Sequence, residues 1–245
     1  MAGAFTTVRF EKRGAIAHII LNRPRHLNAY NIAMRDDLDQ ILDAIYDDHE
    51  VAAMVISGAG RAFSSGGDLT EFGLAPSATV ARTIRFRRDV WGKLKGLPIP
   101  TVAAVHGITA GGGFEIAMLC DVAIAADNTR MWLPETGAGM IPGVCGTQTI
   151  PRRAGIGRAL DLCLTGRWID AREALGLGLI VEVVPSGRLG RAATAMARVM
   201  SAGGRDLTAL AKTAVWDGLD LPIDRGLQLE RRCAQMARRG ARASK

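Results

Sequence analysis

Short apolar runs alternate with helically spaced apolar positions through most of the chain. The runs predict strands at residues 8–13, 15–21, 51–57, 101–105, 122–126 and 179–184, the first two joined by a turn at Arg13-Gly14. Apolar residues with acids between them also recur at every third or fourth position, which predicts a helix over Met34, Leu38, Ile41, Leu42 and Ile45. Strands followed by helices indicate an α/β fold. The strand-strand-helix order recurs loosely, without a fixed sequence period.

The last part of the chain has a helical pattern only. After Pro185, helical spacing covers 187–201, 205–217 and 222–240. Earlier, the sequence predicts a loop at 72–80, then a helix through Ile84, Trp91 and Leu94, and a capping box at Asp170–Glu173 that opens another helix. We therefore divide the chain into an α/β core, residues 1–185, and a C-terminal helical region, residues 186–245, which packs on the core or on a neighbouring subunit.

One stretch, Thr109–Asp121, combines three consecutive glycines, Gly111–Gly113, with a single carboxylate, Glu115. Glycine lets a backbone approach another group closely, because no Cβ stands in the way. A helix that starts at Gly112 or Gly113 points unpaired N–H groups outward, and its dipole favours an anionic oxygen there. The stretch therefore indicates an oxyanion site with an adjacent acid or base. The alternative is a tight strand-to-helix turn with a surface glutamate.

Further motifs accompany this stretch along the chain. They are Leu-Asn-Arg-Pro-Arg-His-Leu-Asn-Ala at 21–29, Phe-Ser-Ser-Gly-Gly-Asp-Leu at 63–69, Pro-Glu-Thr-Gly at 134–137 and Ile-Pro-Gly-Val-Cys-Gly-Thr-Gln at 141–148. In this order they resemble the crotonase superfamily, the enoyl-CoA hydratase/isomerase family. The resemblance implies a crotonase-like spiral of ββα units with a C-terminal helical trimerisation region. It also implies an acyl-CoA thioester as substrate and no cofactor other than the coenzyme A that the substrate carries.

The resemblance also implies the residues of the site. Backbone N–H groups of Gly67 and Gly112 would form an oxyanion hole, which stabilises the negative charge that develops on a thioester oxygen. Two glutamates mark the hydratase branch, and Glu115 and Glu135 match them. Two buried carboxyls push their pKa values apart, so one can act as acid and the other as base, in either assignment. In the alternative, Glu135 caps a turn after Pro134 and Glu115 pairs with an arginine.

The same motifs imply a set of substrate-binding positions. Asp68 is expected to hold the loop that presents Gly67. Arg25 either meets the nucleotide phosphates of CoA or is a solvated loop charge. The full set is Arg25, Leu27, Ala29, Ser65, Gly66, Asp68, Leu69, Pro134 and Gly143.

A pair of glutamates favours a hydro-lyase of fatty acid metabolism, an enoyl-CoA hydratase that adds water reversibly across the double bond of a 2-enoyl-CoA thioester. Isomerases of the family often keep only the later glutamate. Isomerisation, decarboxylation and carbon–carbon hydrolysis at the same oxyanion hole remain alternatives. The acyl group is open, and so is the choice between CoA and a carrier protein as the thiol.

Three positions depart from the family pattern. Cys145 stands where glycine is usual, Thr149 stands where many relatives carry arginine, and the closing acidic-aromatic segment is missing after Arg239. Among substitutions, we expect Gly112→Val to block the thioester oxygen. We expect Gly113→Ala to be milder, because the N–H of Gly113 is not assigned to that oxygen.

Charge and cysteine content narrow the function classes. Lysine and arginine exceed aspartate and glutamate by 31 to 24, giving a net charge of +7 with clusters at 82–88 and 231–245. A nucleic-acid-binding protein on a crotonase scaffold is the alternative from a different class, but no stacking-aromatic motif accompanies the clusters.

The four cysteines and four histidines show no metal-ligand spacing. No secretory segment precedes Phe5 and no apolar run could span a membrane, so we expect a cytoplasmic protein with free thiols and no metal.

Apolar stripes in the helical region 187–240 predict self-association. An α/β core cannot easily cover these stripes alone, so we expect a homotrimer or a dimer of trimers.

Overall fold

Six strands form the larger of two sheets. The computed structural model describes residues 5–74, 77, 80 and 89–243. The strand order is β1-β2-β3-β5-β7-β10, with β1 (Val8–Arg13), β2 (Ile16–Leu21), β3 (Ala53–Gly58), β5 (Thr101–Val105), β7 (Val122–Ala126) and β10 (Glu182–Val184). Strands β1 and β2 pair as an antiparallel hairpin, and the remaining pairs are parallel. All six predicted strands are present, although β10 begins at Glu182 rather than at residue 179, because the N–H of Leu179 still bonds to the carbonyl of Ala174 at the preceding helix.

A smaller sheet makes the fold a spiral. Its order is β4-β6-β8-β9, with β4 (Ala62–Ser64), β6 (Ile108–Ala110), β8 (Arg130–Trp132) and β9 (Ile169–Asp170). Strands β3, β5 and β7 of the large sheet each run directly into β4, β6 and β8 of the small one, and a helix follows each pair. This repetition confirms the predicted spiral of ββα units.

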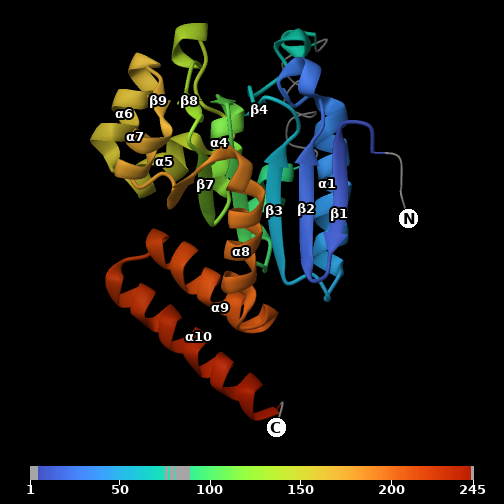
Figure 1. Ribbon diagram of the computed structural model, residues 1–245. Helices are drawn as coiled ribbons and strands as arrows, with labels where there is room; N and C mark the ends of the chain where they lie inside the picture. The colour runs from blue at the N-terminus through green and yellow to red at the C-terminus, as the bar shows by residue number, and fades with distance from the viewer. Residues whose placement is uncertain (1–4, 75–76, 78–79, 81–88, 244–245) are drawn as a thin grey trace.

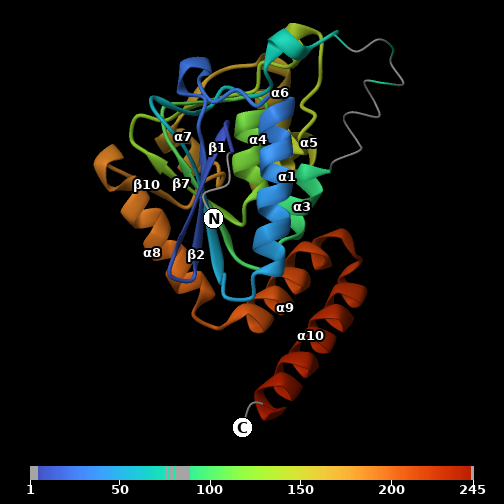
Figure 2. The ribbon, with the colours of Figure 1, turned by 90° about the vertical axis from the view of Figure 1, so that its right-hand side faces the viewer.

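Alternation along the strands separates two apolar layers, and Figure 2 shows helices on both faces of the large sheet. Residues such as Ile19 and Ile56 face α1 (Ile32–Asp47) and α4 (Gly112–Leu119) on one side. Val55 and Val102 face α8 (Leu189–Ser201) on the other. Since neighbouring strand residues point to opposite faces, one strand can serve both layers. The five apolar residues predicted for the first helix are the five that α1 buries. Helix α8 thus belongs to the packing of the sheet, and the division of the chain at residue 185 stays a prediction.

Four further helices of the described chain complete the α/β part of the fold. They are α3 (Val90–Gly96), α5 (Gly146–Ala154), α6 (Ile156–Thr165) and α7 (Ala171–Gly176). Helix α7 is capped as predicted, because Asp170 accepts from the N–H of Glu173 at 2.8 Å. Helix α3 carries Trp91 and Leu94 but begins at Val90, where the Asp89 side chain caps it. The predicted continuous helix is therefore wrong at Asp89, and Ile84 lies outside the described residues.

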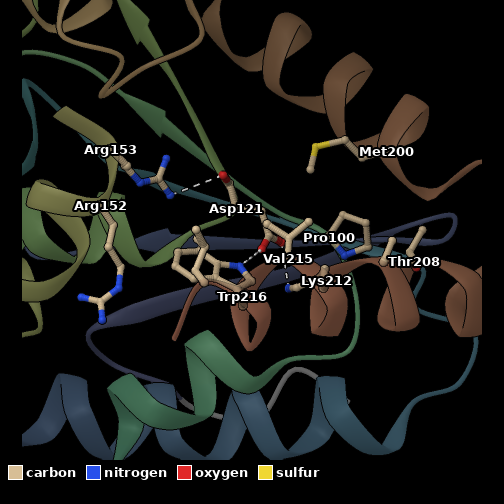
Figure 3. A pocket seen from close by; sticks show the side chains of 11 residues that line it. Pro100, Asp121, Arg152, Arg153, Met200, Thr208, Lys212, Val215 and Trp216 are labelled. Atoms are coloured by element: carbon tan, nitrogen blue, oxygen red, sulfur yellow. Dashed lines mark hydrogen bonds and ion pairs between the residues drawn. The ribbon is translucent and has the colours of Figure 1, made fainter. Parts of the chain in front are cut away.

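The two last helices, α9 (Arg205–Trp216) and α10 (Ile223–Ala243), form a hairpin at the end of the molecule away from β8 and β9 (Figure 1). Asp121 attaches α9 to the core, because its carboxylate receives Lys212 Nζ at 2.8 Å and Trp216 Nε1 at 3.0 Å (Figure 3). A cavity of about 430 Å³ lies there, between α9, α8 and the end of the sheet. The hairpin leaves large apolar side chains exposed, among them Val215, Leu219, Ile223 and Met236.

The described part of the chain shows neither a membrane-spanning helix nor a metal-binding cluster. None of its helices is both long enough and apolar enough to cross a membrane. It also holds no group of three or more histidine, cysteine, aspartate or glutamate side chains arranged to bind a metal ion. Of the two arginine clusters, 82–88 lies outside the described residues and the other begins on α10.

Candidate functional site

Three glycines make the turn from β6 into α4. Gly111 has φ +50° and ψ −129°, a conformation that L residues rarely adopt, and its N–H bonds to the carbonyl of Trp132 at 2.8 Å. Helix α4 begins at Gly112, as the sequence predicts. The N–H groups of Gly112 and Gly113 have no acceptor among the described residues. The turn therefore presents unpaired donors at a helix N-terminus.

Each glycine is required for a different reason. A Cβ on Gly111 would lie 2.6 Å from Glu135 Oε1, and one on Gly112 would lie 2.5 Å from the hydroxyl oxygen of Tyr30. A Cβ on Gly113 would lie 2.7 Å from Ser64 Cβ and closer still to the Ser64 carbonyl. Because this last collision involves the backbone of β4, Gly113→Ala would disturb the fold. The expectation that Gly113→Ala has the milder effect on kcat stays a prediction, but the change carries a cost to the fold that the sequence did not indicate.

The loop after β4 carries Gly67 to the same place. Gly67 pairs with Tyr30 as an isolated β-bridge, in which Tyr30 N–H bonds to the Gly66 carbonyl at 2.8 Å and Asp68 N–H bonds to the Tyr30 carbonyl at 2.9 Å. A Cβ on Gly66 would lie 3.1 Å from the nitrogen of Gly112, so the loop packs against the start of α4. The N–H of Gly67 has no acceptor among the residues that the structure describes. The structure thus brings the two predicted donors, Gly67 and Gly112, together.

Asp68 holds this loop through Arg23. Arg23 Nη1 lies 2.8 Å from Asp68 Oδ2 and 2.6 Å from the carbonyl oxygen of Ala29. Hydrogen bonds from Thr70 and from Arg23 lower the pKa of Asp68, so the carboxylate stays charged. The loop that presents Gly67 is therefore tied to the segment before α1 by a partly buried ion pair.

Glu115 is a buried carboxylate with two backbone donors. It lies in the first turn of α4 and is 1% exposed. Its Oε1 accepts from the N–H of Val144 at 2.8 Å and from the N–H of Gly146 at 2.6 Å. Val144 lies in the loop before α5 and Gly146 is the first residue of that helix, where a Cβ would lie 2.7 Å from Glu115 Oε1. Two N–H donors stabilise negative charge on the carboxylate.

Glu135, unlike Glu115, has no backbone donors from another described segment on its carboxyl group. It precedes the 3-10 turn Thr136–Ala138, yet its side chain makes no capping bond. Its Oε2 is buried and has no hydrogen-bond partner in the described residues. Burial, and secondarily the charge of Glu115, raise the pKa of Glu135 to about 7. The idea that Glu135 caps the turn is therefore wrong, and the two glutamates are near neighbours with unlike preferences for a proton.

Two of the three departures from the family pattern, Cys145 and Thr149, lie beside Glu115. Cys145 sits between the two residues that donate to Glu115, with φ +74° at the start of α5. Burial, and then the charge of Glu115, raise the pKa of its thiol, which keeps Cys145 protonated near neutral pH. Thr149 is buried, and its hydroxyl bonds to the Cys145 carbonyl at 3.1 Å. Thr149 thus supports the left-handed turn that aims Val144 and Gly146 at the carboxylate.

The remaining predicted positions lie at different distances from this centre. Ser65 N–H bonds to the Leu27 carbonyl at 2.9 Å, so the 27–29 segment and the Gly67 loop are adjacent. Pro134 lies next to Gly111, since its Cδ would be 3.8 Å from a Cβ there. Three of the predicted residues, Leu69, Arg25 and Gly143, are exposed to solvent. Gly143 directly precedes Val144 in the loop before α5.

Arg25 is the predicted position with the weakest link to the centre. Within the described residues it forms neither an ion pair nor a hydrogen bond with any other predicted position. Its side chain extends from the 3-10 turn Pro24–His26 at the surface. Both readings of Arg25, as a phosphate contact and as a solvated charge, stay open.

Sequence reasoning missed several members of the site. Asn28 is fully buried with φ +55°, and its Nδ2 bonds to the carbonyls of Ala59 and Ala62. Arg23 and Asn28 belong to the 21–29 motif, so the motif itself could have identified them as its structural residues. Tyr30 carries no such signal, because a tyrosine after the motif is equally compatible with simple core packing.

Comparison with known proteins places these motifs in a family. The enoyl-CoA hydratase/isomerase family matches residues 11–241. A Mycobacterium tuberculosis protein named probable enoyl-CoA hydratase echA8 is 37% identical over 231 residues, covering 93% of this chain and 88% of the relative. The crystal structure of enoyl-CoA hydratase from Bacillus anthracis superposes with a TM-score of 0.89 at 34% identity, covering 94% of this chain and 90% of that one. A Thermobifida fusca chain crystallised in complex with CoA gives 0.90 at 30% identity, covering 98% and 96%. The ββα spiral, the glycine turn and the paired glutamates are thus found in a chain that belongs to the enoyl-CoA hydratase/isomerase family.

Proposed function

We propose that this protein is an enoyl-CoA hydratase, which adds water reversibly to a trans-2-enoyl-CoA thioester. The observation that carries the proposal is the meeting of Glu115 and Glu135 in unlike surroundings. One carboxyl is stabilised as an anion by two N–H donors, and the other has a pKa raised to about 7. Addition of water needs one group that accepts a proton and one that donates a proton, and this pair supplies both at neutral pH.

Glu115 acts as the base in this proposal. Its carboxylate takes a proton from water while the water oxygen bonds to the β-carbon of the substrate. The electron pair of the carbon–carbon double bond then moves through the α-carbon toward the thioester oxygen. The two backbone donors on Oε1 fix the position of the carboxylate that receives this proton.

Glu135 acts as the acid. Its proton passes to the α-carbon, the electron pair returns from the oxygen, and the saturated 3-hydroxyacyl thioester is complete. Glu115 now holds a proton and Glu135 has lost one, so exchange with solvent restores the starting state. The backbone N–H groups of Gly67 and Gly112 stabilise the enolate oxygen between the two proton transfers.

The substrate-binding edge follows from the same arrangement. The thioester lies between the Gly67 loop and the start of α4. The Gly67 loop contributes Ser65, Gly66, Asp68 and Leu69 to substrate binding. Pro134 and Gly143 flank the two glutamates. The segment Arg25–Ala29 then receives the CoA portion, which is the only cofactor-like group that the reaction requires. The four cysteines are free thiols, which supports a reducing, cytoplasmic location. A role in fatty acid metabolism follows from the proposed enoyl-CoA substrate.

The proposal is tested by incubating the purified protein with trans-2-enoyl-CoA thioesters of short, medium and long chain. Mass spectrometry should show a product heavier by one water, and loss of the conjugated double bond should follow the same time course. A product of unchanged mass would indicate isomerisation instead. Loss of carbon dioxide or of an acyl fragment would indicate decarboxylation or carbon–carbon cleavage.

Hydration is expected to slow as the pH rises above about 7, because Glu135 must be protonated to act as the acid and its pKa is raised to about 7. Rates of hydration measured from pH 5 to 9 check this, with values at low pH corrected for stability. In Glu135→Gln, most activity should be lost, and the residual rate should no longer show this decline. A wild-type rate that rises through pH 7 would assign Glu135 as the base.

Glu135 also links stability to pH. Its pKa is about 7 in the folded protein and 4.5 when unperturbed, so the folded chain holds the extra proton between these values. Stability is therefore expected to fall as the pH rises through this window. Gln does not titrate, so at pH 8 the free energy of unfolding of Glu135→Gln should exceed that of wild type by up to about 3 kcal/mol. The difference, measured by denaturant unfolding, should vanish near pH 4.5. A pH-independent difference would contradict the raised pKa.

A homotrimer or a dimer of trimers is expected in solution. The apolar side chains of the α9–α10 hairpin are more than half exposed at Val215, Leu219 and Ile223, and a second copy could bury them. Multi-angle light scattering at working concentration measures the mass directly. Ile223→Asp should dissociate the assembly while circular dichroism stays unchanged. A monomeric wild type would reject the prediction.

A further inference from the structure

Tyr30 lies beside both predicted oxyanion donors. It connects the 21–29 motif to α1, and its ring is partly buried. A Cβ on Gly112 would lie 2.5 Å from its hydroxyl oxygen and 2.6 Å from its Cε1. A Cβ on Gly67 would lie 3.1 Å from Cε2 of the Phe72 ring and 3.5 Å from the same Tyr30 oxygen. The phenol group therefore faces the space that Gly67 and Gly112 leave by having no side chain.

Two sets of contacts keep Tyr30 in this position. Its backbone brackets Gly67, through bonds to Gly66 and Asp68 at 2.8 and 2.9 Å. Its ring meets the ring of Trp91 on α3 edge to face, with centroids 5.2 Å apart and planes at 69°. The backbone contacts and the ring contact come from different parts of the fold. Because both the backbone and the ring of Tyr30 are held, its hydroxyl is already in position before substrate binds.

We propose that the Tyr30 hydroxyl is a third hydrogen-bond donor to the thioester oxygen, alongside the backbone N–H groups of Gly67 and Gly112. The inference rests on the proposed function, because it needs an enolate-forming thioester in the site. A neutral phenol donates its proton in a hydrogen bond and keeps it, so no further proton transfer is added to the reaction. A donor aimed at the place where negative charge develops lowers the barrier more than it strengthens substrate binding.

The proposal also explains why residue 112 is glycine. Gly112 has ordinary helical geometry, so no backbone strain demands a glycine there. The nearest obstacle to a side chain is the Tyr30 phenol itself. Glycine at this position thus preserves the site of the tyrosine hydroxyl as well as the approach to its own N–H.

The test is Tyr30→Phe, which removes the hydroxyl and keeps the ring, the Trp91 contact and the backbone bonds. With a good enoyl-CoA substrate, kcat should fall about ten- to a hundredfold while KM changes little. This decrease in kcat is smaller than the one typical for loss of a backbone oxyanion donor. The matched control is Tyr46→Phe, since Tyr46 is the other tyrosine of the chain and is 58% exposed on α1. It should leave kcat, KM and the melting temperature unchanged.

A second readout separates hydrogen bonding from packing. Bound acetoacetyl-CoA can lose an α-proton, and its enolate absorbs in the near ultraviolet. The pH midpoint of that absorbance should rise by about one unit in Tyr30→Phe, which corresponds to a tenfold weaker stabilisation of the enolate. If the midpoint and kcat equal those of wild type, the inference is wrong. The inference is also wrong if kcat falls only together with the melting temperature while the midpoint stays, because Tyr30 would then be a packing residue.

Failure of the proposed function gives a different result. In that case the wild-type protein would neither hydrate any enoyl-CoA nor bind acetoacetyl-CoA, and the inference about Tyr30 would fall with it. A wild type that binds and enolises the thioester, with a Tyr30→Phe variant that behaves identically, would overturn the inference alone.

Discussion

Glu115→Gln is expected to reduce the hydration rate by about a thousandfold or more, within the range seen when a general base is lost. The amide keeps the size of the carboxylate but cannot accept a proton from water. It also carries less negative charge toward the two backbone donors, Val144 and Gly146, which now hold Oε1 at 2.8 and 2.6 Å. The glutamine oxygen can still accept these bonds, so the fold should survive.

Kinetics with an enoyl-CoA substrate and thermal unfolding check this expectation together. Glu182→Gln is the matched control, because Glu182 is an exposed glutamate on β10 and should tolerate the same change without loss of rate. Binding of CoA to Glu115→Gln should stay within a few fold of wild type. A variant that hydrates at the wild-type rate would remove Glu115 from the mechanism.

Gly112→Val is expected to lower kcat by roughly a hundred- to a thousandfold, the loss typical of one oxyanion donor. The new Cβ would press on the hydroxyl and Cε1 of Tyr30, at 2.5 and 2.6 Å, so the side chains of both residues would have to shift. The N–H of Gly112 would then be screened from the thioester oxygen. The obstacle is a side chain rather than the backbone, so the protein should still fold and bind CoA.

Two glycine variants serve as references for this experiment. Gly157→Val changes a glycine in the first turn of α6 that has open space around it, and it should leave kcat unchanged. Gly113→Ala should lower the melting temperature, since its Cβ would collide with the backbone of Ser64. Calorimetry with CoA measures binding in each variant. If Gly112→Val lost CoA binding and stability together, Gly112 would be a packing glycine.

Several parts of the site could be recognised from short stretches of sequence. The glycine turn before α4 follows from the residue types alone, because only glycine adopts φ +50° easily and admits close neighbours. Glu115 and Glu135 are recognised by their motifs. The relative behaviour of these glutamates could not be predicted, because it depends on donors and burial that other segments provide. Val144 and Gly146 reach Glu115 from about thirty residues further along the chain.

The comparison of Gly112 with Gly113 shows the same limit. Both are glycines of one turn, and from sequence the donor role of Gly112 makes it the more sensitive position. The structure adds an effect on stability in the other direction, because Gly113 packs on the β4 backbone and Gly112 packs on a side chain. Which atom faces a glycine is decided by an element that lies far away in the sequence.

The sequence by itself determined the strands of the large sheet, the buried face of α1 and the identity of the two glutamates, because each depends on local periodicity or on a short motif. The tertiary structure alone decided which glutamate has the raised pKa, which backbone groups hold Glu115, and that Tyr30 faces both Gly67 and Gly112. The reason is physical. Charge states and close contacts depend on burial and on neighbours, and the neighbours here come from β4, α3, α4 and the loop before α5, which only folding brings together.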